Sequence, residues 1–291
     1  MLRSFVAWLD DYLAGEDSSA VVRSAIGLMG FAVLLGVILG NTAVKLGALA
    51  AAILVILSLM LILLRDRKTL KREIYWRDEL LIRYCDLLYD QSQSVALVKD
   101  WNQVVTIERS GDVRELITIR AVALQELYFL RIRADAKWDQ PRRYRRRVRV
   151  DFRSINSAGD RGPSWHVMRS WLSDGRLEML AHLHSPIPKG TAIQVEVERE
   201  WPGKSTPLVK EGISDYFGFF FSNALRIEHG TYVVVLPEGV EVYFEPAGFQ
   251  APDPSFSIRG DRNQDGRFEV VLTVDNLPVD TRIGMRLQRK T

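Results

Sequence analysis

Arginines crowd one short segment of this sequence, with six of them between residues 142 and 149. Residues 141–153 read PRRYRRRVRVDFR, and the alternation of a strand would place Arg145, Arg147, Arg149 and Arg153 on one face. Guanidinium groups stay charged and bind phosphate or carboxylate oxygens with two donors at once. We therefore predict an anion-binding site, for a nucleotide or an oligonucleotide, formed by Arg142, Arg143, Arg145, Arg147, Arg149 and Arg153.

Two other interpretations of the arginines stay open at this stage. The guanidinium groups could contact lipid head groups at the inner leaflet of a membrane. They could also be structural, paired across strands with Glu196 and Glu198.

A short acidic segment matches the opening of a calcium-binding loop, D-x-N-x-D-G, at Asp261, Asn263, Asp265 and Gly266. The complete EF-hand pattern requires a glutamate at the position where this chain has Leu272. Helices flank such loops, whereas strand-like sequence flanks this one. We interpret the segment as a hairpin turn.

His182 and His184 lie two residues apart on an expected strand, so both side chains project to the same side, as in metal-binding pairs. No third ligand can be identified beside them. Cys85, the single cysteine, has no nearby histidine and excludes an intrachain disulfide. We predict neither a metal nor a cofactor.

Catalytic signatures are missing from the sequence. There is no G-x-S-x-G elbow, no phosphate-binding P-loop, no G-x-G-x-x-G and no H-E-x-x-H. No residue is therefore a catalytic candidate, and the prediction is that the chain is not an enzyme.

The elements that must position these residues begin with a long apolar region. Residues 24–44 and 46–64 are uncharged, and Lys45 is the one charged residue between 24 and 64. Each run is long enough to cross about 30 Å of hydrocarbon. With a tight break at Gly40, Asn41 and Thr42, residues 20–64 predict a hairpin of two transmembrane helices.

Basic residues follow the second run and set the predicted orientation. Arg65, Arg67, Lys68, Lys71 and Arg72 crowd its end, whereas the hairpin tip holds Lys45. The excess of positive charge on the cytoplasmic side of membrane proteins then places both termini in the cytoplasm. We predict a multi-pass protein of a bacterial inner (plasma) membrane.

Small residues in the two runs suggest close helix packing. Gly36 with Gly40, and Gly47 with Ala51, are each four residues apart and allow neighbouring backbones to approach. Packing of the hairpin on itself and assembly of several hairpins into a homo-oligomer both fit. A pore, if one forms, would lack intramembrane charge.

The remaining regions differ in the spacing of their apolar residues. Residues 1–19 predict an amphipathic helix at the membrane interface, and 65–100 a connector helix. Residues 101–291 predict a cytoplasmic β-rich domain, a sandwich or barrel of one or two modules. Expected strands cover 103–109, 114–122, 126–134, 144–153, 165–172, 176–183, 192–200, 216–221, 230–236, 240–245, 255–259, 267–274 and 282–288.

The predicted fold class is thus a membrane α-helical hairpin plus an all-β cytoplasmic domain. This layout resembles the membrane effectors of bacterial anti-phage signalling, including the CBASS type. The resemblance implies a soluble domain that senses a nucleotide made by a partner nucleotidyltransferase encoded nearby. The expected function is an oligomeric effector that gates a pore or disrupts the membrane. The alternative is a membrane-tethered scaffold or adaptor that binds a protein partner through its β domain.

Overall fold

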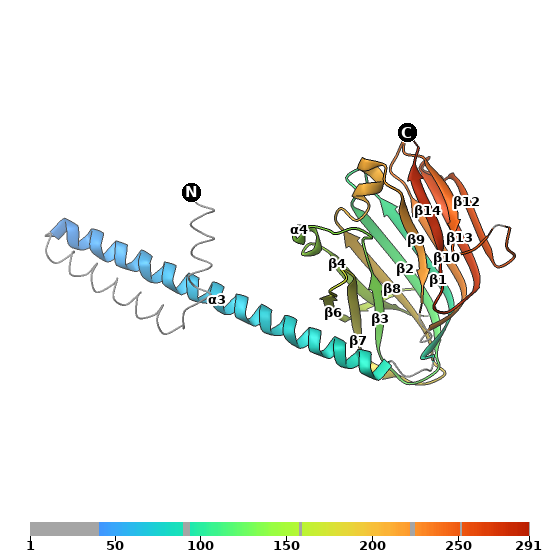
Figure 1. Cartoon of the computed structure of the whole chain (residues 1–291). Coiled ribbons are helices and arrows are strands. Elements are labelled where there is room, and N and C mark those ends of the chain that lie inside the picture. Colours follow the sequence, from blue (N-terminus) through green and yellow to red (C-terminus); the bar gives the residue numbers. More distant parts are fainter. Residues whose placement is uncertain (1–40, 90–93, 157–158, 222–224, 251, 291) are drawn as a thin grey trace. The chain divides into compact units, whose positions relative to one another are not determined.

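The computed structural model describes residues 41–89, 94–156, 159–221, 225–250 and 252–290 (Figure 1). The chain divides into two compact units, Met1–Arg77 and Asp78–Thr291. The predicted interfacial helix over 1–19 and residues 24–40 of the first predicted membrane helix, with Gly36 and Gly40, lie outside the described residues.

One helix, α3 (Asn41–Tyr89), runs for 49 residues without a break. Asn41 and Thr42, where the sequence predicted the turn of a hairpin, already belong to it. Neither proline nor a turn residue interrupts its hydrogen bonding, so the apolar stretch continues directly into the charged residues from Arg65 onward. Gly47 and Ala51 lie inside this one helix. The predicted membrane hairpin joined to an all-β domain is therefore wrong as a fold class.

Membrane crossing was also predicted for this region. In the part of the chain that the structure describes, no helix combines enough length with enough apolar character to span a bilayer. The predicted multi-pass location in a bacterial inner membrane is contradicted by this finding.

Strands make up most of the second unit, with two short helical turns between them. The helical turns are α4 (Arg142–Arg145) and the π-helical η1 (Pro207–Glu211). The strands are β1 (Ala96–Ile107), β2 (Val113–Ala123), β3 (Leu127–Ala134), β4 (Arg149–Ile155), β5 (Arg161–Ser164), β6 (His166–Trp171), β7 (Leu177–Ile187), β8 (Ala192–Trp201), β9 (Asp215–Phe220), β10 (Leu225–Val235), β11 (Val242–Ala247), β12 (Phe256–Arg262), β13 (Phe268–Leu277) and β14 (Arg282–Arg289).

The strands form one large sheet and two small ones. The large sheet has the order β12-β13-β10-β1-β2-β8-β4-β5, and the small sheets have the orders β3-β7-β6 and β11-β14-β9. Neighbouring strands are antiparallel except at the centre of the large sheet, where β1 and β10 run parallel from Ala96 opposite Leu225 onward. Parallel neighbours require a long connection, and here the chain between them builds the strands β2 to β9.

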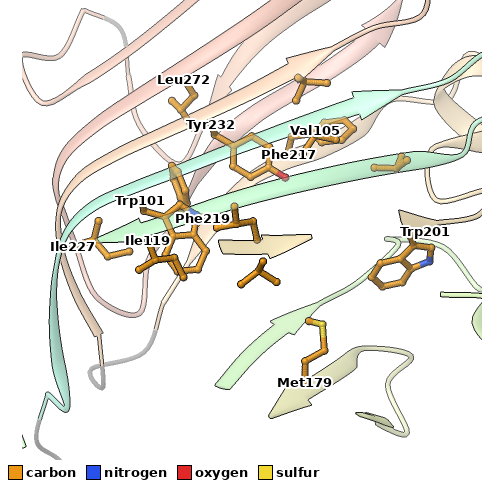
Figure 2. Close-up of a cluster of buried hydrophobic side chains, with 14 of the residues drawn as sticks. Trp101, Val105, Ile119, Met179, Trp201, Phe217, Phe219, Ile227, Tyr232 and Leu272 are labelled. Atoms are coloured by element: carbon orange, nitrogen blue, oxygen red, sulfur yellow. The ribbon is translucent and has the colours of Figure 1, made fainter. Parts of the chain in front are cut away.

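A single core joins the three sheets. Alternate residues of the large sheet, such as Val105, Ile117 and Val234, point to one face and are fully buried. They share a hydrophobic cluster with Phe217 of β9 and Met179 of β7, which belong to the two small sheets. Figure 2 shows several of these side chains, including Val105, Phe217 and Met179. The small sheets thus pack against the same face of the large sheet.

The end of α3 belongs to the second unit and packs on the small sheet that contains β7. Ile82 is 2% exposed and lies in a separate hydrophobic cluster with Met168 of β6 and Leu180 of β7. Phe129 of β3 packs against this cluster. The contact covers the face of the small sheet that is turned away from the main core.

Candidate functional site

The arginine run folds differently from the predicted strand. Pro141 precedes the run with φ −55°, and residues 142–145 form the helical turn α4 before β4 begins at Arg149. Proline is well suited to start a helix because its φ is already helical. Side chains on a helical turn fan outward, so the predicted single row of guanidinium groups does not form.

Three of the predicted binding arginines are held by partners within the chain. Arg145 Nη2 lies 2.6 Å from Asp139 Oδ1, and its guanidinium lies over the ring of Trp171. Arg149 pairs with Glu200 at 3.4 Å, and Arg153 Nε lies 2.5 Å from Asp151 Oδ2. Arg142, Arg143, Arg146 and Arg147 are exposed on the surface.

The two metal-like patterns also have definite places. The D-x-N-x-D-G segment forms the turn between β12 and β13, where Asn263 Oδ1 accepts hydrogen bonds from the backbone N–H groups of Asp265 and Arg267, each at 3.0 Å. His182 is exposed on β7, opposite His166 of β6. Within the described residues, no three His, Cys, Asp or Glu side chains are grouped so that they could hold a metal ion.

A cavity of about 650 Å³ lies among residues of all three sheets. Trp101, Gln103, Ile117, Arg199 and Tyr232 line it from the large sheet. The small sheets contribute Leu130–Ala134 of β3, Asp215–Phe220 of β9 and Arg282 of β14. A volume of this size is typical of small-molecule sites.

Aromatic side chains form one part of the cavity wall. The rings of Trp101 and Phe221 meet edge to face at 4.8 Å between centroids, and those of Phe219 and Tyr232 do so at 5.4 Å. Figure 2 shows Trp101, Phe219 and Tyr232 close together in the interior. This part of the wall is suited to an apolar or aromatic group.

Charged side chains form the other part. Among the described residues that line the cavity, the basic ones are Arg131, Arg133, Lys137, Arg176, Arg199, Lys204 and Arg282, and the acidic ones are Asp135 and Asp215. Several have partners: Arg131 and Arg133 bind Glu178, Lys137 lies 2.7 Å from Asp135, and Arg176 binds Asp174. Cations exceed carboxylates along this wall.

A buried ionic network lies at the base of the cavity. Glu115, with no exposed surface, faces into the interior from β2 and binds both Arg199 of β8 and Lys204. Its Oε2 also accepts a hydrogen bond from Gln103 Nε2 at 3.3 Å, and Gln103 Oε1 accepts one from Trp101 Nε1 at 3.2 Å. Burial by itself raises the pKa of Glu115, but Arg199 and Lys204 outweigh it and hold the pKa at about 2.

Arg199 has donor capacity that the network does not use. The side chain is 3% exposed, and only its Nη2 binds Glu115. Its Nε and Nη1, like the hydroxyl of Tyr216 on β9, have no hydrogen-bond partner among the described residues. A buried donor without an acceptor costs free energy, so an acceptor that enters the cavity would remove this cost.

Asp215 and Tyr216 add two perturbed groups to the same wall. Burial raises the pKa of Asp215 to about 6, and Asp215 accepts a hydrogen bond from the backbone N–H of Tyr216 at 2.8 Å. Burial also raises the pKa of the Tyr216 phenol to about 12. Asp215 therefore changes charge close to neutral pH, whereas Tyr216 stays protonated.

The cavity residues did not emerge from sequence motifs, although a signal was present. Glu115 lies two residues before Ile117 in one expected strand, and Arg199 lies two residues after Val197 in another. A charged residue at an inward-facing position of an apolar pattern marks either a buried ion pair or a binding site.

Comparison with known proteins gives limited information. No family model matches the sequence, and no curated protein matches it. Among solved structures, a putative protease from Parabacteroides distasonis is similar over 67% of this chain and 40% of its own length, with 11% identity and a TM-score of 0.42. An M1 zinc metallopeptidase from Deinococcus radiodurans is similar over 68% of this chain and 43% of its own length, with 13% identity and a TM-score of 0.40. This chain spans less than half the length of either protein.

These findings correct two functional predictions. The prediction that the chain is not an enzyme is not retained, since the similar structures are described as a protease and a metallopeptidase; a likeness at 11% to 13% identity assigns no activity to this chain. The predicted membrane effector with its pore, and the alternative of a membrane-tethered adaptor, are contradicted by the lack of a membrane-crossing helix in the described part of the chain.

Proposed function

We propose that the second unit of this chain binds a small amphipathic anion in the cavity among its three sheets. The observation that carries the proposal is the buried guanidinium of Arg199, whose Nε and Nη1 have no acceptor among the described residues. The same side chain lines the cavity, so an incoming oxygen can reach it.

The charges of the wall favour an acidic group on the ligand. Arg199 and Lys204 share one carboxylate, that of Glu115, which stays ionised because its pKa is about 2. A carboxylate or sulfonate placed here would accept from guanidinium and ammonium donors, and such charge-assisted bonds are stronger than neutral ones. The basic side chains around the cavity would attract the ligand before it binds.

The aromatic wall favours a mainly apolar body for the ligand. Trp101, Phe219 and Tyr232 provide flat, rigid surface within the same cavity. A fully polar anion would lose its own hydration here without gaining favourable contacts with these rings. A fatty or aromatic acid with one head group satisfies both parts of the wall.

The test compares a charged and a neutral ligand of equal length, laurate and lauramide, by isothermal titration calorimetry with the full-length chain. The expected result is that laurate binds at least tenfold more tightly, since one charge-assisted hydrogen bond contributes about 1.5 to 3 kcal/mol. Equal binding of the two compounds, or binding of neither, would overturn the proposal.

A matched pair of variants locates the site. Arg282 lines the cavity with its guanidinium over the ring of Phe220, whereas Arg286 of the same strand pairs with Glu245 at 3.3 Å and does not line the cavity. R282Q should weaken laurate binding about tenfold, and R286Q should leave it unchanged. Equal weakening in both variants would show binding outside the cavity.

A further inference from the structure

The structure assigns a second anion-binding surface to the chain: Arg142, Arg143, Arg146 and Arg147, which form an exposed arginine patch, bind the phosphate backbone of a nucleic acid. The patch is separate from the interior cavity, because none of its four residues lines that cavity. It therefore does not depend on the proposed function above.

The four arginines of the patch are exposed and have no carboxylate partner within 4 Å among the residues that the structure describes. Their neighbours in the run differ, since Arg145 and Arg149 are paired with Asp139 and Glu200. The two nearby carboxylates therefore neutralise Arg145 and Arg149, and the positive charge of the patch is not neutralised.

The local backbone holds the patch together despite the repulsion between its charges. Arg146 N donates to Arg142 O at 3.1 Å, and Arg147 N donates to Tyr144 O at 2.9 Å, so the helical turn continues past α4. Tyr144 anchors this turn through an edge-to-face contact with Trp138. Residues four apart on a helical turn have Cβ atoms about 6 Å apart, which puts Arg142 and Arg146 on one side.

The side chains in this region favour a nucleic acid over a lipid surface. Surface helices that bind membranes insert large apolar side chains, and no residue between 138 and 155 is an exposed large hydrophobic one. Asp139 and Glu200 are paired with Arg145 and Arg149, so the unpaired positive charge of this region lies on the four arginines of the patch. The clustered guanidinium groups of the patch suit neighbouring phosphates of a nucleic acid, because each group can donate two hydrogen bonds to one phosphate.

The binding should be insensitive to base sequence, because phosphate contacts position a nucleic acid without reading its bases. It should weaken steeply with salt. For a single strand the slope of log affinity against log salt concentration is about −0.7 for each phosphate contacted, so four contacts give about −3.

The experiment uses fluorescence anisotropy with a fluorescein-labelled 12-nucleotide single strand and the full-length chain, over a series of KCl concentrations. The patch variant R142Q/R143Q/R146Q/R147Q should lose at least tenfold in affinity and most of the salt slope. The control R109Q/R114Q/R120Q/R286Q removes the same charge from exposed arginines that are each paired with a carboxylate. This control should retain the salt slope, and its affinity for the oligonucleotide should stay within about threefold of that of the unaltered chain.

Equal loss in the patch variant and in the control would overturn the assignment, because general charge would then explain the binding. Failure of the unaltered chain to bind the oligonucleotide at 50 mM KCl would also overturn it. So would patch-dependent binding to vesicles containing phosphatidylglycerol without binding to the oligonucleotide. Both variants should keep the thermal unfolding midpoint of the unaltered chain, and R282Q should bind the oligonucleotide normally.

Discussion

Glu115 and Arg199 lie directly opposite each other on β2 and β8, and their side chains form an ion pair in the interior of the molecule. Glu115 has no exposed surface and Arg199 has 3%. The pair joins two strands of the large sheet at the base of the cavity, so it connects the stability of the fold to the proposed ligand site.

Replacement of Glu115 by glutamine should destabilise the chain by about 3 to 5 kcal/mol, because it leaves Arg199 and Lys204 buried without their carboxylate. Urea unfolding followed by tryptophan fluorescence measures this change. The control is Glu198→Gln on the same strand as Arg199, which removes the pairing of Glu198 with the exposed Arg114 and should cost less than about 1 kcal/mol. Similar losses in both variants would contradict the role given to the buried pair.

The acid limb of the stability profile should also depend on Glu115. Its pKa is about 2 in the fold against an ordinary 4.5, so the carboxylate contributes stability that is present above pH 4.5 and lost as pH falls toward 2. The expected loss is about 3 kcal/mol. Urea unfolding at pH 2.5 and pH 5.5 should show this difference in the unaltered chain and a smaller one in E115Q. An equal loss of unfolding free energy in the two proteins would contradict the role of Glu115.

Asp215→Asn should stabilise the chain at high pH. Burial raises the pKa of Asp215 to about 6 from 3.8, so the folded chain favours the neutral carboxyl group. The stability that this neutral form contributes is fully present below pH 3.8 and is lost as the pH rises through 6. The variant should gain on the order of 2 to 3 kcal/mol at pH 8 and almost nothing at pH 3.5. The measurement is the free energy of unfolding at both pH values, and a gain that is equal at both would contradict the pKa of Asp215.

Ile82→Ala should destabilise the second unit by about 2 to 4 kcal/mol, because it leaves a cavity between α3 and the small sheet at Met168 and Leu180. Its neighbour Leu81 is 50% exposed, so Leu81→Ala should change the stability by less than about 0.5 kcal/mol. Thermal unfolding midpoints compare the two variants. If both midpoints are unchanged, the end of α3 does not pack on the sheet.

Gly248→Ala should be much more harmful than Gly239→Ala. Both glycines have positive φ, +89° and +77°, so a methyl group strains the backbone at either position by about 1 kcal/mol. At Gly248 the added Cβ would also lie 1.8 Å from the carbonyl oxygen of Arg282, whereas nothing lies within 4 Å of it at Gly239. The yield of folded protein and the unfolding midpoint should fall sharply for G248A alone. Equal effects in the two variants would mean that the positive φ, and not the contact with Arg282, causes the loss of stability.

Several strands could be predicted from the sequence. The expected strands 114–122, 126–134 and 192–200 agree closely with β2, β3 and β8. In β2 every second residue from Val113 to Ala123 is buried, so the alternation of period two in the sequence reports burial directly. The turn at Asp265 and Gly266 also followed from its residue types. These features are local, and local sequence is sufficient for them.

Tertiary structure alone decided the rest. The parallel pairing of β1 with β10 joins residues more than 120 positions apart, and the division into three sheets depends on which distant strands meet. The apolar run after Asn41 was misinterpreted because hydropathy does not show that a helix continues through a predicted turn. The arginine run alternates like a strand, yet residues 142–145 form a helical turn that follows Pro141 and is held by the contact of Tyr144 with Trp138. Glu115 and Arg199 became a site only when β2 and β8 paired, because a buried charge acquires its role from the partner that the fold brings to it.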